Sequence, residues 1–405
     1  MEKNIPFETA RDLLLARCGT VEAETMELSA AHWRILARDI RAVTDMPPFP
    51  HSPYDGYAFR SADSAEAGRE HPVTLRVVEN IAAGQTPQQK IAPGTAARIM
   101  TGAPIPEGAD TVVMYETTEF TPETVTIFST ASPGLDIVPA GEDITAGTLL
   151  ASRGDLVDPA LAGALAAQGL TIIEVFKRPR IGVISTGNEL VEADQPISGG
   201  AIRNSNRHAL EAACARAGAE PVYLGRARDD TGEIAALMEK GLQTCEMVCT
   251  SGGVSVGDFD FTPAALDRVG AETLIRGVRI KPGGACAHGI RDGRLIFGFS
   301  GNPAAAMINF YSLAWPCLRK LSGHRQALPR TTRITLEGGF FKKSPNTRII
   351  SGRLDLSDGV VRMKVAAVQG NAILRTLIGC DVMAVIPAGS PPLPAGTVLE
   401  AYLLD

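Results

Sequence analysis

Short glycine-rich loops carry most of the side chains in this sequence that could take part in chemistry. The clearest is "TSGGVSVGDFD" (250–260), in which three glycines and two aspartates follow the apolar run "CEMVC". Four similar loops are "STGNEL" (185–190), "RARDD" (226–230), "KPGG" (281–284) and "FSGNPAAA" (299–306). A glycine lets the backbone turn sharply and approach a ligand closely. The pattern therefore predicts a ligand site built from loops.

The polar groups of these loops are of the kinds that bind a magnesium ion and an anion. Mg²⁺ takes one or two protein carboxylates together with phosphate oxygens of a substrate. Asn302 and Pro303 can begin a helix whose free N–H groups would face an anion. The other candidates are hydroxyls, carboxylates and one lysine: Ser185, Thr186, Ser251, Ser255, Glu189, Asp229, Asp230, Asp258, Asp260 and Lys281.

Each loop also has an ordinary interpretation. Glycine and aspartate after a strand often form a plain turn, and "SGNP" is also a normal helix start. Lys281 alone is typical of a solvated surface lysine, and Glu189 alone of a residue favoured by a helix dipole. Five such loops at the edge of one sheet favour a binding site over five separate turns.

A parallel sheet would bring these loops together. Apolar runs predict strands at 180–184, 221–225, 246–250, 274–280 and 294–299. Helices are predicted between them, one over 204–218 with Asn204 or Ser205 as its cap, and one over 262–270. This alternation is typical of an α/β domain, in which ligands bind at the carboxyl ends of the strands.

The rest of the chain has a different character. Residues 1–45 carry apolar side chains at helical spacing, and the helical patch 158–169 could join them in one discontinuous domain. Residues 46–140 are rich in Pro, Gly, Thr and Val and predict a small β-rich domain. Short β runs after residue 328 predict a terminal barrel or sandwich. The predicted fold class is α/β plus β, in several domains.

Two stretches of the β-rich region resemble motifs more than plain strands. They are "PPFPHSPYDGYAFRSAD" (47–63) and "ARIMTGAPIPEGADTVVMYE" (97–116). Both are rich in turn formers and internal polar groups, so each could form a functional edge or a structural hairpin corner.

Composition excludes several classes of protein. The 405 residues are 45% hydrophobic with a formal net charge of −6, and no long basic run suggests a nucleic-acid partner. No apolar run reaches about 18 residues and the first residues lack the order of a secretory signal, so we expect a cytoplasmic protein that does not span a membrane.

Motif spacing excludes other chemistry. The seven cysteines are never spaced CxxC and the histidines form no HxxxH pair, which argues against disulfides and a zinc centre. "GGVSVGD" is followed by Asp258 and not by Lys-Ser/Thr, so Walker chemistry is rejected. No G-x-G-x-x-G follows a predicted strand, which leaves a dinucleotide fold without its fingerprint.

Taken in order, the motifs resemble those of the molybdopterin molybdenumtransferase family, the group of MoeA, the gephyrin E-domain and the plant Cnx E-domain. The resemblance spans nearly the whole chain. It rests on "SPYDGYA", "RIMTGAPIPEGAD", "GEDI", "STGNEL", "TSGGVSVGDFD", "KPG" and "GNP".

The resemblance implies four domains and a dimer. The domains would be a discontinuous helical domain (1–45 and 141–177), a β-rich domain (46–140), a molybdopterin-binding α/β domain (178–327) and a C-terminal β-barrel-like domain (328–405). Family members form homodimers whose site joins the α/β domain of one subunit to the β-rich domain of the other.

The resemblance also implies a reaction and the residues that perform it. Molybdate is inserted into adenylylated molybdopterin in the presence of Mg²⁺, and AMP is released. Asp55, Thr101, Glu189, Asp229 and Asp260 would be catalytic, and the last three would handle the metal. Substrate would be bound by Asp143, Ser185, Thr186, Ser251, Gly252, Gly253, Lys281, Ser300, Gly301, Asn302, Pro303 and Arg353.

The chain departs from the family pattern near the expected anion site. "KPGGA" stands where the family reads K-P-G-K-P, and "FSGNP" where it reads L-P-G-N-P, so a cation is missing at Gly284 and a proline at Ser300. "HSPYDG" replaces N-S-A-M-D-G. These changes imply an altered binding of the oxyanion.

Three other interpretations stay open from the sequence. One is a paralogue that inserts tungsten or uses a modified pterin, and another is a pterin-binding scaffold without turnover. A third, an adenylyltransferase of the Mog type, is disfavoured by "SPYDGYA" and "IMTGAP", although contact with such an enzyme is a possible partnership.

Overall fold

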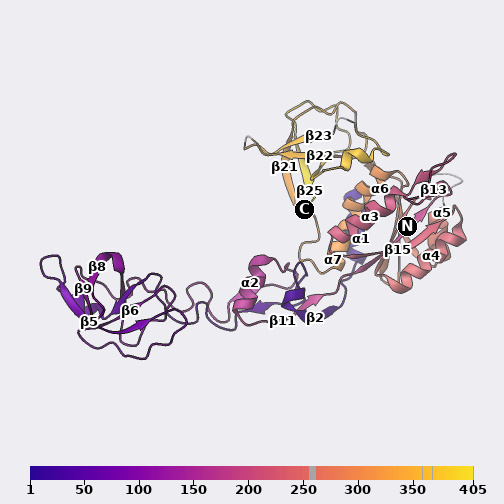
Figure 1. Cartoon of the computed structure of the whole chain (residues 1–405). Coiled ribbons are helices and arrows are strands. Elements are labelled where there is room, and N and C mark those ends of the chain that lie inside the picture. Colours follow the sequence, from indigo (N-terminus) through magenta and orange to yellow (C-terminus); the bar gives the residue numbers. More distant parts are fainter. Residues whose placement is uncertain (255–260, 358, 367, 405) are drawn as a thin grey trace. The chain divides into compact units, whose positions relative to one another are not determined.

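The computed structural model of the chain describes residues 1–254, 261–357, 359–366 and 368–404. It forms two compact units. The first comprises 1–38, 153–158 and 172–405, and the second comprises 39–152 and 159–171. Figure 1 labels the elements of both. The four predicted domain boundaries stay a prediction.

The centre of the first unit is a seven-stranded sheet in the order β1-β17-β19-β20-β16-β12-β15. Its four strands at one side are parallel: β12 (Arg180–Thr186), β15 (Glu220–Ala227), β16 (Met247–Ser251) and β20 (Arg294–Phe299). They confirm the predicted strands. The other strands are β1 (Glu2–Ile5), β17 (Glu272–Val278) and β19 (Ala287–Arg291).

The strand–helix alternation predicts a parallel sheet, but the observed sheet is mixed. Strand β19 runs antiparallel to both β17 and β20. Asp292 (φ 51°) and Gly293 (φ 76°) form the turn between β19 and β20. A two-residue Asp-Gly turn with both φ values positive connects antiparallel neighbours directly, so no crossover helix is needed.

Helices cover both faces of this sheet. One buried cluster joins it to α1 (Phe7–Arg17), α3 (Ser205–Arg216), α6 (Pro303–Asn309), a π-helical turn (Phe310–Ala314) and α7 (Trp315–Leu321). A second cluster joins the opposite face to α4 (Thr231–Thr244) and α5 (Phe261–Arg268). The side chain of Asn204 caps α3 by accepting a hydrogen bond from Arg207 N, as the sequence predicts.

The first 45 residues are less helical than predicted. Only α1 is a helix of more than one turn, and the second stretch forms η1 (Leu28–Ala30) and extended segments. Trp33 has a φ of 62°, which an α-helix does not allow. Ile35 and Leu36, whose apolar side chains suggested a helix, instead form bridges to Leu156 and Val175. Strand β2 (Ala23–Glu27) pairs with β11 (Ile172–Phe176).

The second unit is built on a six-stranded sheet in the order β7-β4-β6-β5-β9-β8. Its strands are β4 (Gly56–Phe59), β5 (Val73–Ile81), β6 (Thr95–Ile99), β7 (Thr111–Met114), β8 (Thr118–Phe120) and β9 (Thr124–Ile127). Turns η2 (Ser61–Ser64) and η3 (Tyr115–Thr117), the pair β3 (Ile40–Arg41) and β10 (Leu149–Ala151), and α2 (Pro159–Ala167) complete it. The predicted β-rich character is confirmed.

The C-terminal residues of the first unit form a closed five-stranded barrel. Strand β22 pairs with both β23 and β24, which closes the sheet on itself. The strands are β21 (Thr331–Leu336), β22 (Thr347–Asp355), β23 (Arg362–Val365), β24 (Val382–Ile386) and β25 (Val398–Leu403). The short helical turn η5 (Leu374–Leu377) lies between β23 and β24 in the chain. The short β18 (Ile280–Lys281) extends from the α/β part and pairs with β22.

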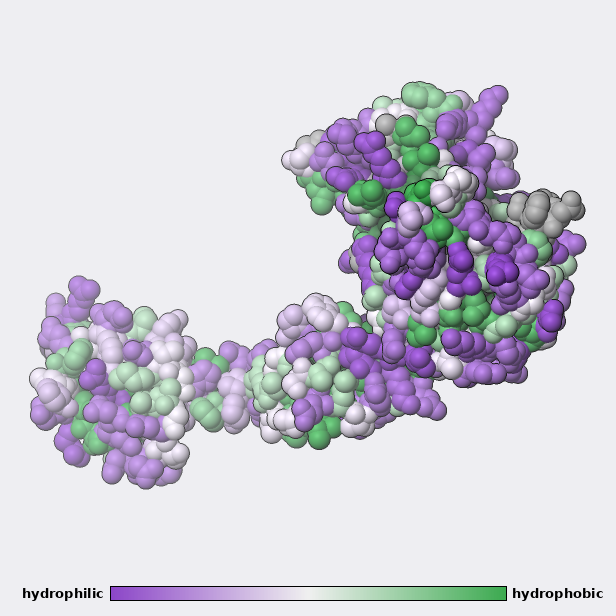
Figure 2. Space-filling model, turned by 45° about the vertical axis from the view of Figure 1, so that its right-hand side comes forward, coloured by the Kyte–Doolittle hydropathy of each residue, from purple (hydrophilic) through white to green (hydrophobic). Residues whose placement is uncertain are grey.

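Hydrophilic and hydrophobic residues are interspersed over the visible face of each unit (Figure 2). None of the helices in the described ranges combines the length and the apolar character needed to cross a membrane.

Candidate functional site

The polar loops of the α/β part begin side by side. Ser185 of β12 is level with Ser251 of β16, which is level with Phe299 of β20. On the other side, Thr186 is level with Ala227 of β15. Because these strands are parallel, the loops that follow them leave the sheet at one edge, as the predicted fold requires.

A small pocket of about 70 Å³ lies at this edge. Buried hydroxyls of Thr186 and Ser251 and the exposed Glu189 contribute to it. The described residues that line it are Thr186, Glu189, Leu190, Ile202, Arg203, Asn204, Ser205, Asn206, Ser251, Gly301 and Pro303. Five of these residues were candidates from the sequence, and the structure brings them together.

Glycine at 252 is required by space and by conformation. Its φ is +108°, and a Cβ there would lie 2.4 Å from Thr186 Oγ1. The backbone oxygen of Gly252 accepts a hydrogen bond from Thr262 Oγ1 at 3.0 Å, and Gly253 O accepts one from Thr262 N at 2.9 Å. The hydrogen bonds hold the start of the loop after β16 against α5, and the close approach of Gly252 to Thr186 packs it against the end of β12.

Glu189 and Asp229 follow the ends of neighbouring strands. Asn188 N donates to Asp229 Oδ2, and Asp229 N donates to Asn188 Oδ1, both at 3.3 Å. The Glu189 carboxylate folds back over Gly187, where a Cβ would lie 2.5 Å from Glu189 Oε2. The two loops are therefore joined while Glu189 stays exposed at the pocket.

Two buried asparagines tie the pocket walls together. Asn206 Nδ2 donates to Ser251 Oγ at 2.7 Å and to Gly301 O at 2.8 Å. Asn204 Oδ1 accepts a hydrogen bond from Ser185 Oγ at 3.1 Å. The sequence predicted Asn204 only as a helix cap and gave no role to Asn206. The signal was the stretch "RNSN", in which both amides lie at the start of α3 and face the sheet edge.

The start of α6 contributes the last wall. Asn302 occupies the N-cap position and Pro303 begins the helix, as predicted, but the Asn302 side chain makes no capping hydrogen bond. Asn302 N instead donates to Ser300 Oγ at 3.2 Å. Pro303 lines the pocket, so the start of the continuous α6–α7 segment points toward it.

Lys281 and Arg353 are not among the residues that line this pocket. Lys281 is exposed in β18, beside the barrel. Arg353 belongs to β22, donates to Ile378 O at 3.2 Å and lines a separate pocket of about 450 Å³ with Arg375. Their predicted roles stay predictions.

The loop after Lys281 has no room for the side chain that the family pattern would place there. A Cβ at Gly284 would lie 2.8 Å from Ile280 O and 2.9 Å from Val278 O. Both contacts are with backbone, and Val278 N donates to Gly284 O at 3.0 Å. A lysine at this position would require these carbonyl groups to move.

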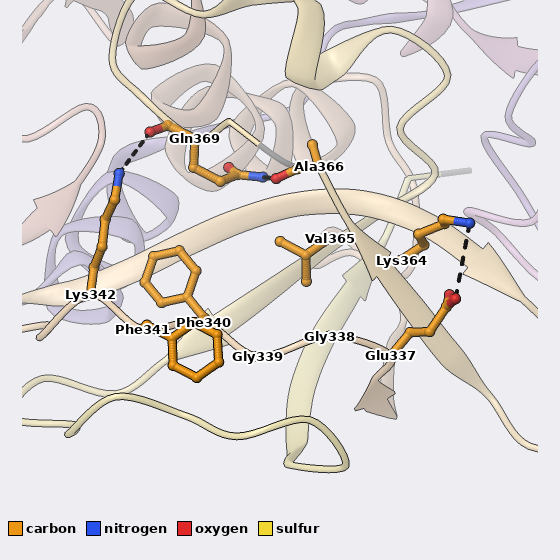
Figure 3. A pocket seen from close by; sticks show the side chains of 10 residues that line it. All are labelled: Glu337, Gly338, Gly339, Phe340, Phe341, Lys342, Lys364, Val365, Ala366 and Gln369. Atoms are coloured by element: carbon orange, nitrogen blue, oxygen red, sulfur yellow. Dashed lines mark hydrogen bonds and ion pairs between the residues drawn. The ribbon is translucent and has the colours of Figure 1, made fainter.

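A second large pocket of the barrel, also about 450 Å³, is drawn in Figure 3. Its lysines already have partners, since Lys364 Nζ lies 3.9 Å from Glu337 Oε1 and Lys342 Nζ donates to Gln369 O at 3.3 Å. Phe341 is 75% exposed there. None of the residues predicted for the site lines it.

In the second unit, Asp55 and Thr101 form a compact pair. Asp55 Oδ1 accepts hydrogen bonds from Thr101 N at 2.7 Å and from Thr101 Oγ1 at 2.8 Å. The backbone hydrogen bond, the hydroxyl and the nearby Arg98 guanidinium lower the pKa of the exposed Asp55 carboxyl. The pair is thus a preformed carboxylate at the surface. Asp143 is exposed in the same unit.

The carboxylates fit magnesium by their chemistry. In the ranges that the structure describes, no three His, Cys, Asp or Glu side chains gather as a ready metal site. Mg²⁺ needs only one or two protein carboxylates when substrate phosphate and water complete its shell, and Glu189 and Asp229 offer carboxylates of this kind. The third predicted ligand, Asp260, lies outside the described residues, as do Ser255 and Asp258.

The fold and the pocket define a multidomain α/β protein with a polar ligand site at the carboxyl edge of its sheet. Residues 5–169 match the family described as MoeA N-terminal region (domain I and II), and residues 182–320 match the probable molybdopterin binding domain.

Relatives and solved structures agree with these matches. The molybdopterin molybdenumtransferase of Bacillus subtilis (strain 168) is 34% identical over 95% of this chain and 90% of that protein. The enzyme of that name from Staphylococcus epidermidis is 33% identical over 100% of this chain and 97% of its own. A crystal structure of the Pyrococcus horikoshii OT3 molybdopterin biosynthesis MoeA protein has a TM-score of 0.86 at 26% identity, covering 99% of this chain and 100% of that one.

The chain belongs to the molybdopterin molybdenumtransferase family, and it is a transferase of molybdenum cofactor biosynthesis. The resemblance found in its motifs is confirmed.

Proposed function

We propose that this protein inserts molybdate into adenylylated molybdopterin in a Mg²⁺-dependent reaction that releases AMP. The observation that carries the proposal is the pocket in which Glu189, Thr186 and Ser251 meet the start of α3 and the start of α6. Family membership adds the substrate class. The described lining combines hydroxyl and amide groups with one carboxylate, Glu189, and one guanidinium, Arg203, which suits a phosphate that is shared between protein and a metal ion.

Different residues of the pocket would bind the phosphate and the metal ion. Backbone N–H groups in the first turn of α3 and the hydroxyl of Ser251, which accepts from Asn206 Nδ2 and keeps its own proton free, would bind the phosphate. Thr186 would line the site and help to orient the pterin. Glu189 and Asp229 would hold Mg²⁺, with Asp260 as a further candidate. The ion would neutralise phosphate charge and polarise the bond to AMP. The backbone at Ser251 would keep Thr186 in place, because Thr186 Oγ1 donates to Ser251 O at 3.2 Å.

The proposal includes a homodimer in the cytoplasm. By resemblance, Asp55 and Thr101 would reach the substrate from the second subunit. The lowered pKa of Asp55 would keep its carboxyl ionised at neutral pH, where it could interact with a bound cation or a polar substrate group. Transfer of the substrate from a Mog-type adenylyltransferase would supply the adenylylated pterin.

One observation favours a variant of this function. Backbone carbonyl groups occupy the space around Gly284, so the cation that the family pattern places there is excluded. The oxyanion would then be bound with less positive charge, and the same reaction with tungstate is the second candidate.

The test is AMP release by purified protein from adenylylated molybdopterin, with Mg²⁺ and either molybdate or tungstate. We expect release with at least one oxyanion, and its loss when Mg²⁺ is removed with a chelator. Binding of the pterin without any release of AMP would instead identify a scaffold. Release that does not depend on Mg²⁺ would remove the metal from the proposal.

A further inference from the structure

One side of the pocket is formed by a segment that has little structure of its own. We call residues 189–204 the flap segment. Strands β13 (Leu190–Val191) and β14 (Ile202–Arg203) pair within it, with Ile202 N donating to Glu189 O at 2.8 Å and Asn204 N to Val191 O at 2.9 Å. Of the eleven described residues that line the pocket, this segment supplies Glu189, Leu190, Ile202, Arg203 and Asn204. The shape of the pocket therefore depends on where the segment lies.

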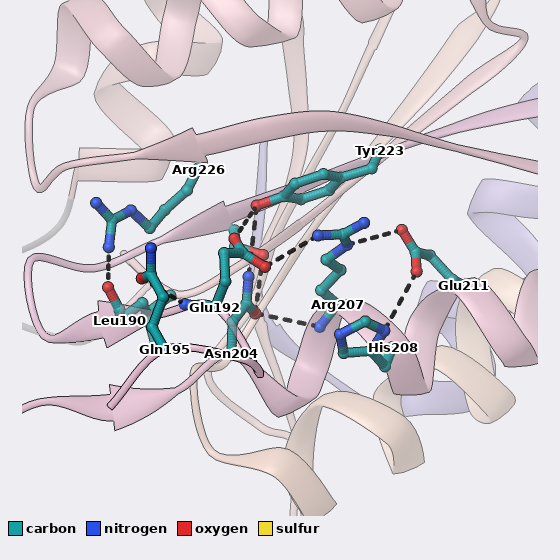
Figure 4. Close-up of polar contacts among 10 residues, drawn as sticks. Leu190, Glu192, Gln195, Asn204, Arg207, His208, Glu211, Tyr223 and Arg226 are labelled. Atoms are coloured by element: carbon teal, nitrogen blue, oxygen red, sulfur yellow. Dashed lines mark hydrogen bonds and ion pairs between the residues drawn. The ribbon is translucent and has the colours of Figure 1, made fainter. Parts of the chain in front are cut away.

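Arg207 of α3 holds the flap segment through Glu192. Arg207 Nη1 lies 2.9 Å from Glu192 Oε2, while Arg207 Nε lies 3.0 Å from Glu211 Oε1 on the next turn of the helix. The side chains of Arg207 and Glu192 are 26% and 33% exposed, so the ion pair is partly shielded from water. Figure 4 shows Arg207 between the two carboxylates. Partial burial makes such a pair stronger than one at an open surface.

Tyr223 of β15 completes the arrangement from the sheet. The Arg207 guanidinium carbon lies 3.7 Å from the centre of the Tyr223 ring, a close cation–π contact. Tyr223 Oη donates to Glu192 Oε1 at 3.1 Å and lies 3.5 Å from Asn204 Nδ2. Glu192 is thus held by α3 and by β15 together. Arg226 of β15 also donates to Leu190 O at the start of the segment.

We propose that Arg207 is a positioning residue that keeps the flap segment in its binding conformation, so that Glu189 and Asn204 line the pocket before substrate arrives. Arg207 does not line the pocket itself. Its contacts lie behind the segment, on α3 and β15. The identity of the substrate rests on the proposed function, whereas the ordering of the segment does not.

Removal of Arg207 should lower the fraction of molecules in which the flap segment is closed over the pocket. Without Arg207, the segment would sample open conformations, and only the closed fraction would bind substrate well. Apparent affinity falls by that fraction, while the bound complex keeps its geometry. We therefore expect KM to rise about tenfold for a closed fraction of about one tenth, with kcat changed less than about twofold.

The chain offers a matched control for the ion pair. Arg291 bonds Glu239 through both terminal nitrogens and is 25% exposed, close to the exposure of Arg207. Arg291 lies at the end of β19, and neither it nor Glu239 lines the pocket. Arg291→Met removes a comparable ion pair from the same α/β part without touching the flap segment.

The first experiment is hydrogen exchange of the free protein. Arg207→Met should speed exchange at the amides of Ile202 and Asn204 at least tenfold, while Arg291→Met should leave them unchanged. Equal protection of these amides in wild type and Arg207→Met would overturn the proposal. This measurement needs no substrate, so it decides the role of Arg207 even when AMP release is absent.

The second experiment is the KM for adenylylated molybdopterin in AMP release. Arg207→Met should raise KM with kcat nearly kept, Arg207→Lys should recover part of the loss, and Arg291→Met should change neither constant. A fall in kcat at constant KM would show that Arg207 acts on the reaction step and would overturn the positioning role. Absence of AMP release in the wild type would refute the proposed function alone.

Discussion

The two ends of the first unit carry pockets of opposite kinds. At the α/β sheet, a pocket of about 70 Å³ is lined by groups from the ends of three strands and the starts of two helices. At the barrel, two pockets of about 450 Å³ each are lined by fewer segments, and lysines there are already paired. Among the described residues, Arg353 is the only member of the candidate site that lines either of the larger cavities.

The difference shows that the candidate site is distinguished by the convergence of polar loops and not by the volume of its pocket. A parallel sheet aligns the ends of its strands, so short polar loops from distant parts of the chain reach one place. A closed barrel holds its strands by pairing all around, and its hollows are lined by whatever side chains the loops leave between them.

The largest effect is expected from Glu189→Gln at the α/β pocket. Loss of a charge that we propose to hold the cation should lower AMP release by about a hundredfold or more, since electrostatic groups at phosphoryl sites have effects of this order. The measurement is kcat/KM at saturating and limiting Mg²⁺, with unchanged circular dichroism as the control for folding. Full activity in this variant would place the metal elsewhere.

Gly252→Ala at the sheet edge should lower both stability and substrate binding, whereas the same substitution at a barrel glycine should leave activity unchanged. The new Cβ would meet Thr186 Oγ1 at 2.4 Å in a backbone with φ +108°. We expect a loss of about 1–3 kcal/mol in unfolding free energy together with weaker binding of substrate.

The matched substitution for Gly252→Ala is Gly389→Ala in the barrel, where φ is +82° and nothing lies within 4 Å of the new Cβ. It should lose only about 1 kcal/mol from backbone strain and no activity. Denaturant unfolding and AMP release measure both variants. Equal losses of activity would contradict a special role for the loop after β16.

Acid should weaken the α/β part before the barrel. Burial lowers the pKa of His288 to about 3, and its ring packs against Phe297 at 5.0 Å. Protonation therefore favours the unfolded chain: the stability is complete above about pH 6.5 and is lost as the pH falls toward 3. Between pH 7.5 and pH 5 the loss is roughly 2 kcal/mol. Residues 328–405 contain no histidine.

The measurement for His288 is unfolding followed by the fluorescence of the buried Trp315 in a Trp33→Phe background. His288→Leu should remove this part of the pH dependence. The same slope with and without the histidine would show that other groups control the acid transition.

The smallest effect is expected from Lys364→Ala at the barrel pocket. Its ion pair with Glu337 spans 3.9 Å between side chains that are 75% and 42% exposed, and such surface pairs contribute at most about 1 kcal/mol. AMP release should stay within about twofold of wild type. A tenfold rise in KM would show that the barrel pocket belongs to the substrate site. It would contradict the assignment of substrate binding to the sheet-edge pocket.

The sequence predicted the elements best where local signals agree. The strands β12, β15, β16 and β20 are continuous apolar runs followed by glycine-rich loops, so both their positions and their shared edge were predictable. Asn204 was found because a cap is a local feature. The short Asp292-Gly293 turn is also local, and reading it as a hairpin would have predicted the antiparallel β19.

Other features depend on contacts between distant residues and have no local signal. Strand β1 pairs with β17 across about 270 positions, as Glu2 lies level with Ile275. Trp33 takes a positive φ because the chain around it pairs with distant strands. Asn206 donates a hydrogen bond to Gly301, and Arg207 stacks on Tyr223. No spacing in the sequence predicts either contact.

The loop at Gly284 constrains how this protein could change over evolutionary time. A lysine there would meet the carbonyl oxygens of Ile280 and Val278 at 2.8 and 2.9 Å, so the mutation is costly unless the backbone has already moved. Substitutions that shift these carbonyls would have to come first, while they offered no advantage in binding the oxyanion. The present backbone therefore disfavours a direct change from glycine to lysine at position 284. Selection for tighter oxyanion binding is more readily met by new charges on neighbouring loops than by a lysine at position 284.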